Sequence, residues 1–518
     1  MKKRILSLCL AALMLATTVL FAACSSEGGK TPTTTPAVTD GNTPGSDAVT
    51  TEPPVTEAPC PIEDEDMDNY DFMIYECWLD KISEQGEFLY SEDSGAVLDE
   101  AKYKRNSLVE EKFNITITVE NVHGTSTTGS NEGYGKFLKA KTAGDPTYDA
   151  VNLPAYDQTK LAQNGALYDL NALPYLDTTN AWWDQNVVKE LTIKDTLFFL
   201  VGDYSTDAFD AAIAVTFNKE LAKEKGINDL YTLVAEGKWT FDKFKEYTSL
   251  VSEDLNGDDR FTNMDLYGAL SWDDAIYGIA HSAGGRCCTL DDEGNLVLEL
   301  GSEAVFNAFN SYVEFSKEDC FLRYQVTFHE NGTVTDNSGS MYGVEMFTNN
   351  QGLFFLGTIG AVSGNFRDMD VDYGILPLFK NNESVDRYYS TISPYSARFL
   401  GCPIFLNDEE VVGKVLETIS FYSAQIIVPA YYEKTLNGTV IRDEESSPML
   451  NIIRDTRVYD LGYFYQPANI NKQLIIQFRA ARADWMSTYK GLEKAANLQL
   501  KNINKALTQQ AEQWAAEK

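Results

Sequence analysis

A short acidic loop has the residue types and spacing of a calcium site. Oxygen-bearing side chains alternate along residues 254–265, and an aspartate stands at both the first and the twelfth position. Oxygen ligands at positions one, three, five and twelve, with a backbone carbonyl at seven, can surround one Ca²⁺. The candidate ligands are Asp254, Asn256, Asp258, Arg260 (through its carbonyl), Thr262 and Asp265. A metal held here would be structural, not catalytic.

Two positions depart from the pattern of an EF-hand. Position six is Asp259 where an EF-hand has glycine, and Asp265 replaces the longer glutamate that binds calcium through both oxygens. The loop resembles the short calcium loops of dockerins more than a sensor EF-hand. The alternative is a solvated acidic turn that binds no metal.

Aromatic and acidic residues stand next to each other where predicted strands and loops end. Sugars have C–H faces that stack on aromatic rings, and hydroxyls that pair with carboxylates. Aromatic residues make up 12% of the chain, so such pairs could build a sugar site, but most aromatics of a large α/β protein lie in its core. The candidate ligand-binding residues are Tyr156, Asp157, Trp183, Asp184, Trp272, Asp273 and Tyr277, with Tyr395, Asp203 and Tyr204 as weaker candidates.

Few residues could act as catalytic groups. The three histidines, His123, His281 and His329, are scattered, and no HExxH motif, Gly-x-Ser-x-Gly elbow or glycine-rich phosphate loop occurs. Carboxylate pairs such as Asp273–Asp274 are common in so acidic a chain and do not by themselves indicate glycoside hydrolysis. We therefore expect no enzyme activity; an exported glycoside hydrolase is the least favoured alternative.

The first 66 residues have the composition of a leader and a tether. Basic residues at 2–4 precede an apolar run from Ile5 to Phe21, as in a signal peptide. The sequence Phe21-Ala-Ala-Cys24 resembles a bacterial lipobox, which implies a signal peptide over 1–23 and a lipid on the Cys24 sulfur; the alternative is a free secreted protein. Residues 24–66 are rich in Thr, Pro, Ser and Gly, so we expect a disordered tether.

Net charge and cysteine content limit the partners. The formal charge of −35 argues against nucleic acid and against a basic grip on anionic lipid, so the lipid anchor would be the only membrane contact. Six of the eight cysteines remain after Cys9 and Cys24 are set aside, and no CxxC pair occurs. Their number permits disulfides, but buried free thiols are the simpler expectation.

Strand and helix patterns alternate along the N-terminal half of the folded region. Strand patterns cover 70–78, 115–120 and 148–153, and helical spacing covers 98–113 and 135–143. Residues 241–251 place apolar side chains on one helical face after Thr240, and an apolar strand is expected over 266–270. Later helices are expected over 408–421, 447–458, 470–489 and 492–517. This order predicts an α/β fold with a parallel or mixed sheet.

Five short motifs occur in the order found in extracellular solute-binding proteins of the maltose-binding type. They are Gly144–Asn152, Leu161–Leu170, Phe217–Leu221 with Lys225-Gly226, Trp239–Asp242 and Asp372–Lys380. The resemblance implies a two-lobed periplasmic-binding-protein fold (type II), with crossover strands near 202–212 and 391–401. It assigns 68–205 plus 351–395 to lobe one and 206–350 plus 396–518 to lobe two. The aromatic–acidic pairs named above would then line the cleft between the lobes.

The same resemblance implies a function. It indicates the substrate-binding lipoprotein of an ABC importer, a monomer on the outer face of the cytoplasmic membrane. Such a protein would pass a solute, here most simply a mono- or oligosaccharide, to ABC permease subunits. The alternative is a surface glycan-binding protein that is not coupled to transport.

Overall fold

The structure is a computed structural model. It describes residues 59–79, 86–90, 96–124, 132–323, 326–328, 334–336, 342–366, 369–432 and 445–517. The signal peptide, Cys24 and most of the expected tether lie outside these residues.

The first sheet has the strand order β15-β3-β1-β2. Strand β1 (Tyr70–Leu79) pairs in parallel with β2 (Ile115–Gly124) along its whole length and with β3 (Ala150–Pro154) on its other side. Strand β15 (Arg398–Gly401) pairs with β3 in the antiparallel sense. Helix α1 (Val97–Phe113) connects β1 and β2, so this part of the chain is the α/β unit that the alternating pattern predicted.

The second sheet is mixed and has the order β13-β4-β12-β6-β5, with β9 also paired to β6. Its strands are β4 (Ile213–Asn218), β5 (Ser252–Glu253), β6 (Leu266–Ser271), β9 (Phe321–Arg323), β12 (Gly352–Thr358) and β13 (Tyr373–Pro377). Strands β4, β6 and β13 are buried along their whole length, which explains why they read as continuous apolar runs.

The chain passes between the sheets in two segments that touch each other. Leu200 still bridges to Leu400 beside the first sheet, whereas Ala212, just before β4, bridges to Ile392. The amide of Ser393 also donates to the carbonyl of Ala211, with an N–O distance of 2.9 Å. Both crossing segments lie within the predicted ranges 202–212 and 391–401. A two-strand ladder of β14 (Ser390–Thr391) with β16 (Arg457–Val458) lies beside the second crossing.

The division of the lobes predicted from sequence was wrong in two segments. Residues 351–395 were expected with the first sheet, but β12 and β13 pair within the second. The start of 396–518 was expected with the second sheet, but β15 pairs with β3 and the helix after it packs on α1. An apolar strand fits any buried position of a sheet, so its pairing partner cannot be read from its own sequence.

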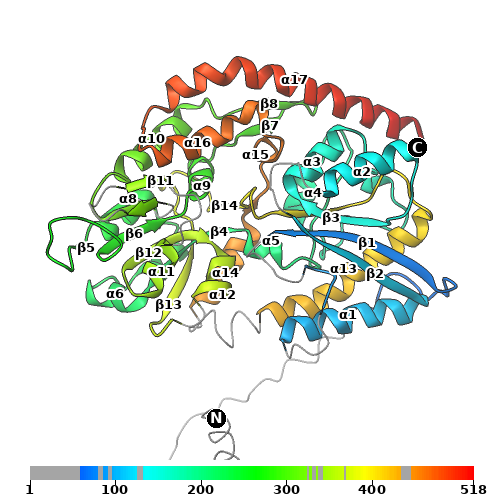
Figure 1. The fold of residues 1–518 in the computed structure, drawn as a ribbon, viewed down its shortest axis with the longest axis horizontal. Helices are drawn as coiled ribbons and strands as arrows, with labels where there is room; N and C mark the ends of the chain where they lie inside the picture. Colours follow the sequence, from blue (N-terminus) through cyan, green and yellow to red (C-terminus); the bar gives the residue numbers. More distant parts are fainter. Residues whose placement is uncertain are drawn as a thin grey trace, which may run out of the picture. The chain divides into compact units, whose positions relative to one another are not determined.

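Helices and two short hairpins surround the sheets (Figure 1). The remaining helices are α2 (Glu132–Ala143), α3 (Ala155–Gln163), α4 (Gln185–Leu191), α5 (Asp207–Asp210), α6 (Lys219–Glu224), α7 (Leu230–Ala235), α8 (Phe241–Thr248), α9 (Ala275–Ser282), α10 (Glu303–Phe315), α11 (Tyr342–Thr348), α12 (Ile359–Asn365), α13 (Glu409–Tyr432), α14 (Ser446–Asp455), α15 (Leu461–Tyr465), α16 (Ile470–Arg479) and α17 (Trp485–Glu517). The hairpins are β7 (Cys288–Leu290) with β8 (Leu296–Leu298), and β10 (Val326–Phe328) with β11 (Val334–Asp336).

Helix α8 forms as its sequence predicts. The Thr240 side chain caps it by accepting from the amide of Lys243, and Asp242 lies in its first turn. Phe241 and Phe244 are buried, and both pack against Phe379, which follows β13. The periodic apolar face of this helix therefore forms part of the core under the second sheet.

The last helix, α17, packs on α10 near its start and on α3 near its end. Near its start, Trp485 packs against Phe309 of α10 and donates its indole N–H to the carbonyl of Leu300. Near its end, Trp514 packs against Tyr168, with ring centroids 4.5 Å apart. Figure 1 shows the helix along one edge, from α10 and α16 to α3.

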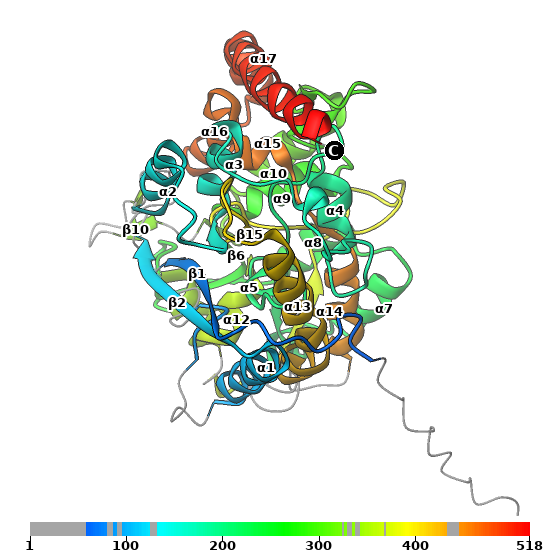
Figure 2. The ribbon, with the colours of Figure 1, turned by 90° about the vertical axis from the view of Figure 1, so that its right-hand side faces the viewer.

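Helix α13 is long and apolar but lies in the core. Among the described residues, the stretch Glu409–Tyr431 is the one helix that by length and composition could cross a membrane, and 67% of its most apolar window is buried inside the protein. The helix packs along α1, as Figure 2 shows. Its apolarity is therefore explained by burial against α1 and against the segment that carries Pro174, Trp182 and Trp183.

The folded region begins earlier than the tether prediction allowed. The backbone amides of Glu65 and Met67 donate to the carbonyls of Lys112 and Phe113 at the end of α1. Lys112 also pairs with Asp64. Residues 64–66, assigned to the disordered tether, are thus held against α1 by backbone hydrogen bonds that composition does not reveal.

The cysteines of the described residues are free thiols. Cys77, Cys287, Cys288, Cys320 and Cys402 are buried, and Cys60 is half-buried. This matches the simpler of the two expectations for the six cysteines.

Candidate ligand-binding site

Predicted site residues from both sheets and from the second crossing meet in one place. Tyr156 opens α3 directly after β3, and Trp272 follows β6. The Trp272 ring lies edge-on to Tyr395 of the second crossing, with centroids 6.4 Å apart. Tyr156 is close enough to Asp274 and Tyr395 for their charges to raise its pKa, in addition to the larger effect of burial. Ends of strands from two sheets thus converge on the crossing segments.

Two of these aromatic rings offer a surface to a ligand. Tyr395 is 44% exposed and Trp272 is half-buried. Tyr156 and Tyr277 are buried, and the Tyr277 ring packs on Tyr463 with centroids 4.6 Å apart. The site therefore has an accessible aromatic pair, Trp272 and Tyr395, together with buried tyrosines. Accessible rings of this kind can stack on an apolar face of a ligand.

An acidic pair lies beside the aromatic rings. Asp273 is paired with the Arg479 guanidinium of α16. Asp274 accepts a hydrogen bond from Ser393, with an oxygen–oxygen distance of 3.0 Å. Burial raises the pKa of Asp274 to about 7 and the charge of Asp273 adds to this, whereas Ser393 and Arg479 oppose it. Near neutral pH this carboxyl is poised between donating and accepting a hydrogen bond.

We expect acidification from pH 8 to pH 5.5 to stabilise the fold partly through Asp274. Because the folded pKa lies above the ordinary value of 3.8, the folded state binds more protons than the unfolded state between about pH 4 and pH 7. Stability from this group is therefore gained as pH falls through about 7. In urea unfolding at the two pH values, Asp274→Asn should reduce the gain by about 2 kcal/mol. An unchanged gain would show that Asp274 does not titrate in this range.

Three residues near the site were not among the candidates from the sequence. Ser393 is a single serine in the second crossing. Gln466, whose side chain opposes the rise in the pKa of Tyr156, has the left-handed backbone (φ 50°, ψ 53°) between α15 and Pro467. Arg479 ends α16, more than 200 residues from Asp273. The X-Pro step at Gln466 marks the end of a helix, but nothing in the sequence brings these residues together.

The other predicted site residues lie in buried structural contacts. The indole N–H of Trp183 donates to the Glu417 carboxylate of α13, with an N–O distance of 2.9 Å, and the ring is 1% exposed. Asp184 caps α4, accepts from the Tyr459 hydroxyl and pairs with Arg457. Asp157 is fully buried near Lys160, whose pKa is lowered by burial against the opposing charge of Asp157. The structure does not bring Trp183 and Asp184 to the Trp272–Tyr395 pair.

The weaker candidates of the first crossing are also covered. Tyr204 is fully buried and donates its hydroxyl to the carbonyl of Leu200. Burial raises the pKa of Asp203 to about 6, and the charges of Arg454 and Arg457 oppose this rise. Neither residue presents a ligand-facing surface comparable to that of Tyr395.

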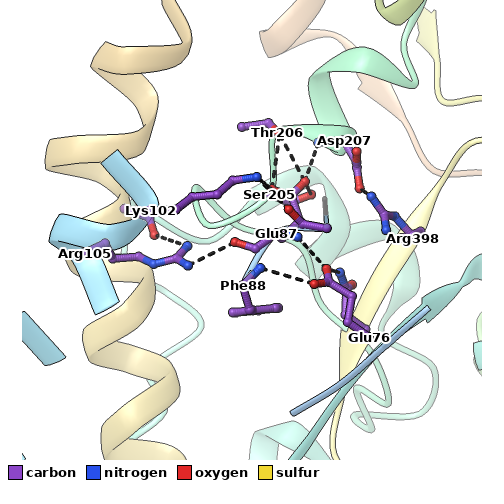
Figure 3. Close-up of polar contacts among 12 residues, drawn as sticks. Glu76, Glu87, Phe88, Lys102, Arg105, Ser205, Thr206, Asp207 and Arg398 are labelled. Atoms are coloured by element: carbon purple, nitrogen blue, oxygen red, sulfur yellow. Dashed lines mark hydrogen bonds and ion pairs between the residues drawn. The ribbon is translucent and has the colours of Figure 1, made fainter. Parts of the chain in front are cut away.

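A buried ionic network fixes the first crossing to the first sheet (Figure 3). The Glu87 carboxylate accepts from the Asp207 amide at 2.7 Å and from the Thr206 hydroxyl at 3.2 Å. It also lies 4.0 Å from the Lys102 ammonium of α1. Arg105 of the same helix donates to the Glu87 carbonyl at 3.0 Å. These groups are nearly inaccessible to solvent, so each charge depends on its partners.

The same network extends to β1 and β15. The Glu76 carboxylate accepts from the amides of Glu87 and Phe88, and Arg398 of β15 pairs with the Asp207 carboxylate. Arg398 also donates to the carbonyl of Cys77, with an N–O distance of 3.3 Å. Residues 76–77, 87–88, 205–207 and Arg398 are thereby joined where the chain passes between the sheets, so the network holds the first crossing in place.

A buried histidine forms hydrogen bonds that resemble a catalytic relay, but the group is closed to substrate. His281 lies between the Asp460 carboxylate at 3.0 Å and the Thr391 hydroxyl at 2.6 Å. All three side chains are buried, and burial lowers the pKa of His281 although the Asp460 carboxylate, which accepts its hydrogen bond, opposes this. The hydrogen bonds of His281 connect α9 to β14 and to the start of α15. The Thr391 hydroxyl is buried in this structure, so a substrate could not contact it.

In the acidic loop the side-chain oxygens bond to the loop's own amides. Asp254 accepts from the amides of Gly257 and Asp259, and Asp265 accepts from those of Leu255 and Thr262. Among the described residues, no group of three or more His, Cys, Asp or Glu side chains is placed to hold a metal ion. Asp259, the residue that replaces glycine, has φ 61°, the conformation for which an EF-hand uses glycine.

Comparisons with known proteins were made by sequence and by structure. No family model matches the sequence, and no curated protein matches it either. Solved structures match across 84–85% of this chain. A cyclo/maltodextrin-binding protein bound to maltotetraose matches at TM-score 0.52 and 12% identity, with 96% of it covered. The cyclic α-maltosyl-1,6-maltose-binding protein of Arthrobacter globiformis matches at 0.54 and 13%, with all of it covered. UgpB from Mycobacterium tuberculosis, bound to glycerophosphocholine, matches at 0.52 and 15%, with 98% covered.

The chain has the two-lobed type II periplasmic-binding-protein fold. In this type II fold the first sheet is the centre of lobe one, the second sheet is the centre of lobe two, and the two crossings join them. The Trp272–Tyr395 pair and the Asp273–Asp274 pair then stand where lobe two meets the second crossing, and Tyr156 reaches them from lobe one.

Proposed function

We propose that this protein is the substrate-binding lipoprotein of an ABC importer and captures a carbohydrate between its two lobes. The observation that carries the proposal is the meeting of Tyr156 from lobe one with Trp272 and Tyr395 from lobe two and the second crossing. A ligand held there contacts both lobes and stabilises their closed arrangement, which the permease subunits would recognise.

The residues of the site fit a neutral sugar better than a charged solute. Tyr395 and Trp272 offer rings for stacking, and Asp274, Ser393 and Gln466 offer hydrogen-bonding groups for hydroxyls. The Asp273 carboxylate and the Arg479 guanidinium already satisfy each other, so this pair leaves no free charge to select an ion. Two of the structural neighbours are named for α-glucan ligands, which supports the same class.

A thermal-shift screen of the chain from residue 25 tests the proposal. A ligand at about 100 times its dissociation constant adds about 2.7 kcal/mol to the folded state, a shift of several degrees. We expect stabilisation by one class of mono- or oligosaccharide and none by peptides. A shift with peptides alone would reject the carbohydrate assignment, and turnover of a chromogenic glycoside would reject the binding-protein assignment in favour of a hydrolase.

The membrane anchor is tested separately at Cys24. We expect Cys24→Ser to move the protein from the membrane fraction to the soluble fraction, because the acidic surface offers no other grip on lipid. Metabolic labelling with a fatty acid should mark the original chain and not the variant. A membrane-bound Cys24→Ser protein would contradict lipid attachment at this residue.

Calcium binding at the acidic loop stays a prediction. Calcium at 1 mM should raise the melting temperature of the chain relative to EGTA, and Asp254→Ala should remove the difference. The Asp254 carboxylate receives two loop amides, so Asp291→Ala, which removes a similar exposed turn carboxylate in the β7–β8 hairpin, is the matched control. Equal melting temperatures in calcium and EGTA would leave the loop as an acidic turn.

A further inference from the structure

A cavity lies where the end of α17 meets lobe one, away from the Trp272–Tyr395 site. Its volume is about 510 Å³, within the range of small-molecule sites. One wall is the end of α17, and the opposite wall is the end of α3 with the segment that follows β15. Tyr168 of lobe one packs against Trp514 here, so the cavity lies at a fixed contact of α17.

Amide side chains dominate the lining of this cavity. Gln163 and Asn164 come from lobe one, and Gln509, Gln510 and Gln513 come from α17. The Gln510 amide nitrogen donates to the carbonyls of Gln163 and Ala506, but its carbonyl oxygen is buried and has no partner within the described part of the chain. A buried acceptor without a donor is costly, and a ligand hydroxyl could supply the missing donor.

Gly165 lies next to this acceptor and next to Lys141. Gly165 has φ +64°, and a Cβ built on it would stand 3.5 Å from the Gln510 carbonyl oxygen and 3.1 Å from the Lys141 ammonium. Lys141 itself donates to the carbonyl of Asn164. The lining therefore places the Gln510 carbonyl oxygen and the Lys141 ammonium near each other, on either side of Gly165, which has no side chain.

Aromatic rings supply the apolar part of the lining. Phe405 is 43% exposed at the edge of the cavity, and Trp514 is largely buried against Tyr168. A ring with nearly half its surface in solvent, next to several amides, offers stacking together with hydroxyl pairing.

Charge decides which class of ligand this lining fits. The lining has no carboxylate and one lysine, on a chain whose net charge is −35. A cation finds no carboxylate to pair with, and an anion meets one engaged lysine in a negative field. A neutral polyhydroxylated molecule finds amide donors and acceptors as well as an exposed ring.

We propose that this cavity is a second saccharide-binding site, separate from the one between the lobes. It would hold one or two sugar units of a longer glycan whose end is captured at Trp272 and Tyr395. This site rests on the carbohydrate class assigned above but not on coupling to transport.

Affinity electrophoresis in native gels that contain soluble starch, xylan, mixed-linkage β-glucan or galactomannan tests the second site. Phe405→Ala/Gln513→Ala changes two exposed side chains and should keep the fold, which melting temperature checks. We expect this variant to bind the retarding polysaccharide about 5- to 10-fold more weakly, or about 1–1.4 kcal/mol, while its affinity for a tetrasaccharide of the same glycan is unchanged. Gln499→Ala, on an earlier turn of α17, is the control and should migrate as the original chain does.

The outcomes separate this proposal from the site between the lobes. Trp272→Ala/Tyr395→Ala should lose tetrasaccharide binding but keep some retardation, which adding Phe405→Ala/Gln513→Ala removes. Retardation by the cavity variant equal to that of the original chain, or retardation by none of the four polysaccharides, overturns the second site. If Phe405→Ala/Gln513→Ala weakened binding of a peptide and not of a glycan, the cavity would not be a saccharide site.

Discussion

Replacement of Arg398 by methionine is expected to lower the free energy of unfolding by about 3–5 kcal/mol. The guanidinium pairs with the Asp207 carboxylate and donates to the carbonyl of Cys77, and both carboxylate and guanidinium are almost completely buried. One oxygen of Asp207 already has no hydrogen-bond partner within the described residues. Removal of Arg398 would leave this carboxylate charged and unpaired in a site that water does not reach, which is the costly way to break a buried ion pair. Urea unfolding followed by circular dichroism measures the loss.

A double variant distinguishes a charge effect from a packing effect. Asp207→Asn together with Arg398→Met removes both charges and should recover a clear part of the stability lost in Arg398→Met. Lys243→Ala breaks an exposed pair with Glu246 in α8 and should cost less than 1 kcal/mol. A loss below 1 kcal/mol for Arg398→Met would contradict the structural role assigned to the network at the first crossing.

Removal of both accessible rings of the site, in Trp272→Ala/Tyr395→Ala, is expected to weaken sugar binding by about 100-fold or more. Each ring supplies contact area to the ligand, and truncation of a central aromatic anchor typically costs about 2 kcal/mol. Isothermal titration with the saccharide found in the thermal-shift screen gives the affinity. The fold should survive, because Tyr395 is 44% exposed and Trp272 is only half-buried.

The matched control for this variant is Tyr103→Ala. Tyr103 is 47% exposed on α1 of lobe one and packs on Tyr90, so its loss removes a similarly exposed ring that is not part of the site. The dissociation constant of Tyr103→Ala should remain within about twofold of the original value. The corresponding change in binding free energy is well under the 1.4 kcal/mol of a tenfold change. If Trp272→Ala/Tyr395→Ala bound as tightly as Tyr103→Ala, the ligand would lie somewhere other than at this aromatic pair.

Local periodicity predicted the elements where one pattern dominated. The apolar face after Thr240 gave α8, and β-branched alternation from Ile115 gave β2. The helix expected over 470–489 is instead two helices, α16 and α17, because Ala481 takes the left-handed conformation (φ 50°). No glycine or proline marks that break, so the sequence offers no local signal for it.

Contacts between residues far apart in the sequence determine whether an aromatic residue lies in the core or in the site. Tyr156 and Trp272 were proposed because each follows a predicted strand, and Tyr395 because it lies in the second crossing; the structure places Trp272 beside Tyr395. Trp183 had the same local signature, but the Glu417 carboxylate of α13, 234 residues away, accepts its indole N–H in the core. A carboxylate that distant leaves no trace in the spacing around Trp183, so an aromatic residue of the core and one of a site look the same in sequence.

Closure of the two lobes on a sugar would shorten the distance between them, and that distance can be measured. Spin labels on Thr142→Cys in α2 and Glu246→Cys in α8, in a Cys60→Ser chain that starts at residue 25, report one distance across the molecule; the other five thiols of that chain are buried and should not react. Pulsed electron–electron double resonance should show that this distance changes from a longer to a shorter value when the saccharide from the screen is added, and that Trp272→Ala/Tyr395→Ala keeps the longer value. A distance distribution that the bound saccharide leaves unchanged would contradict capture between closing lobes.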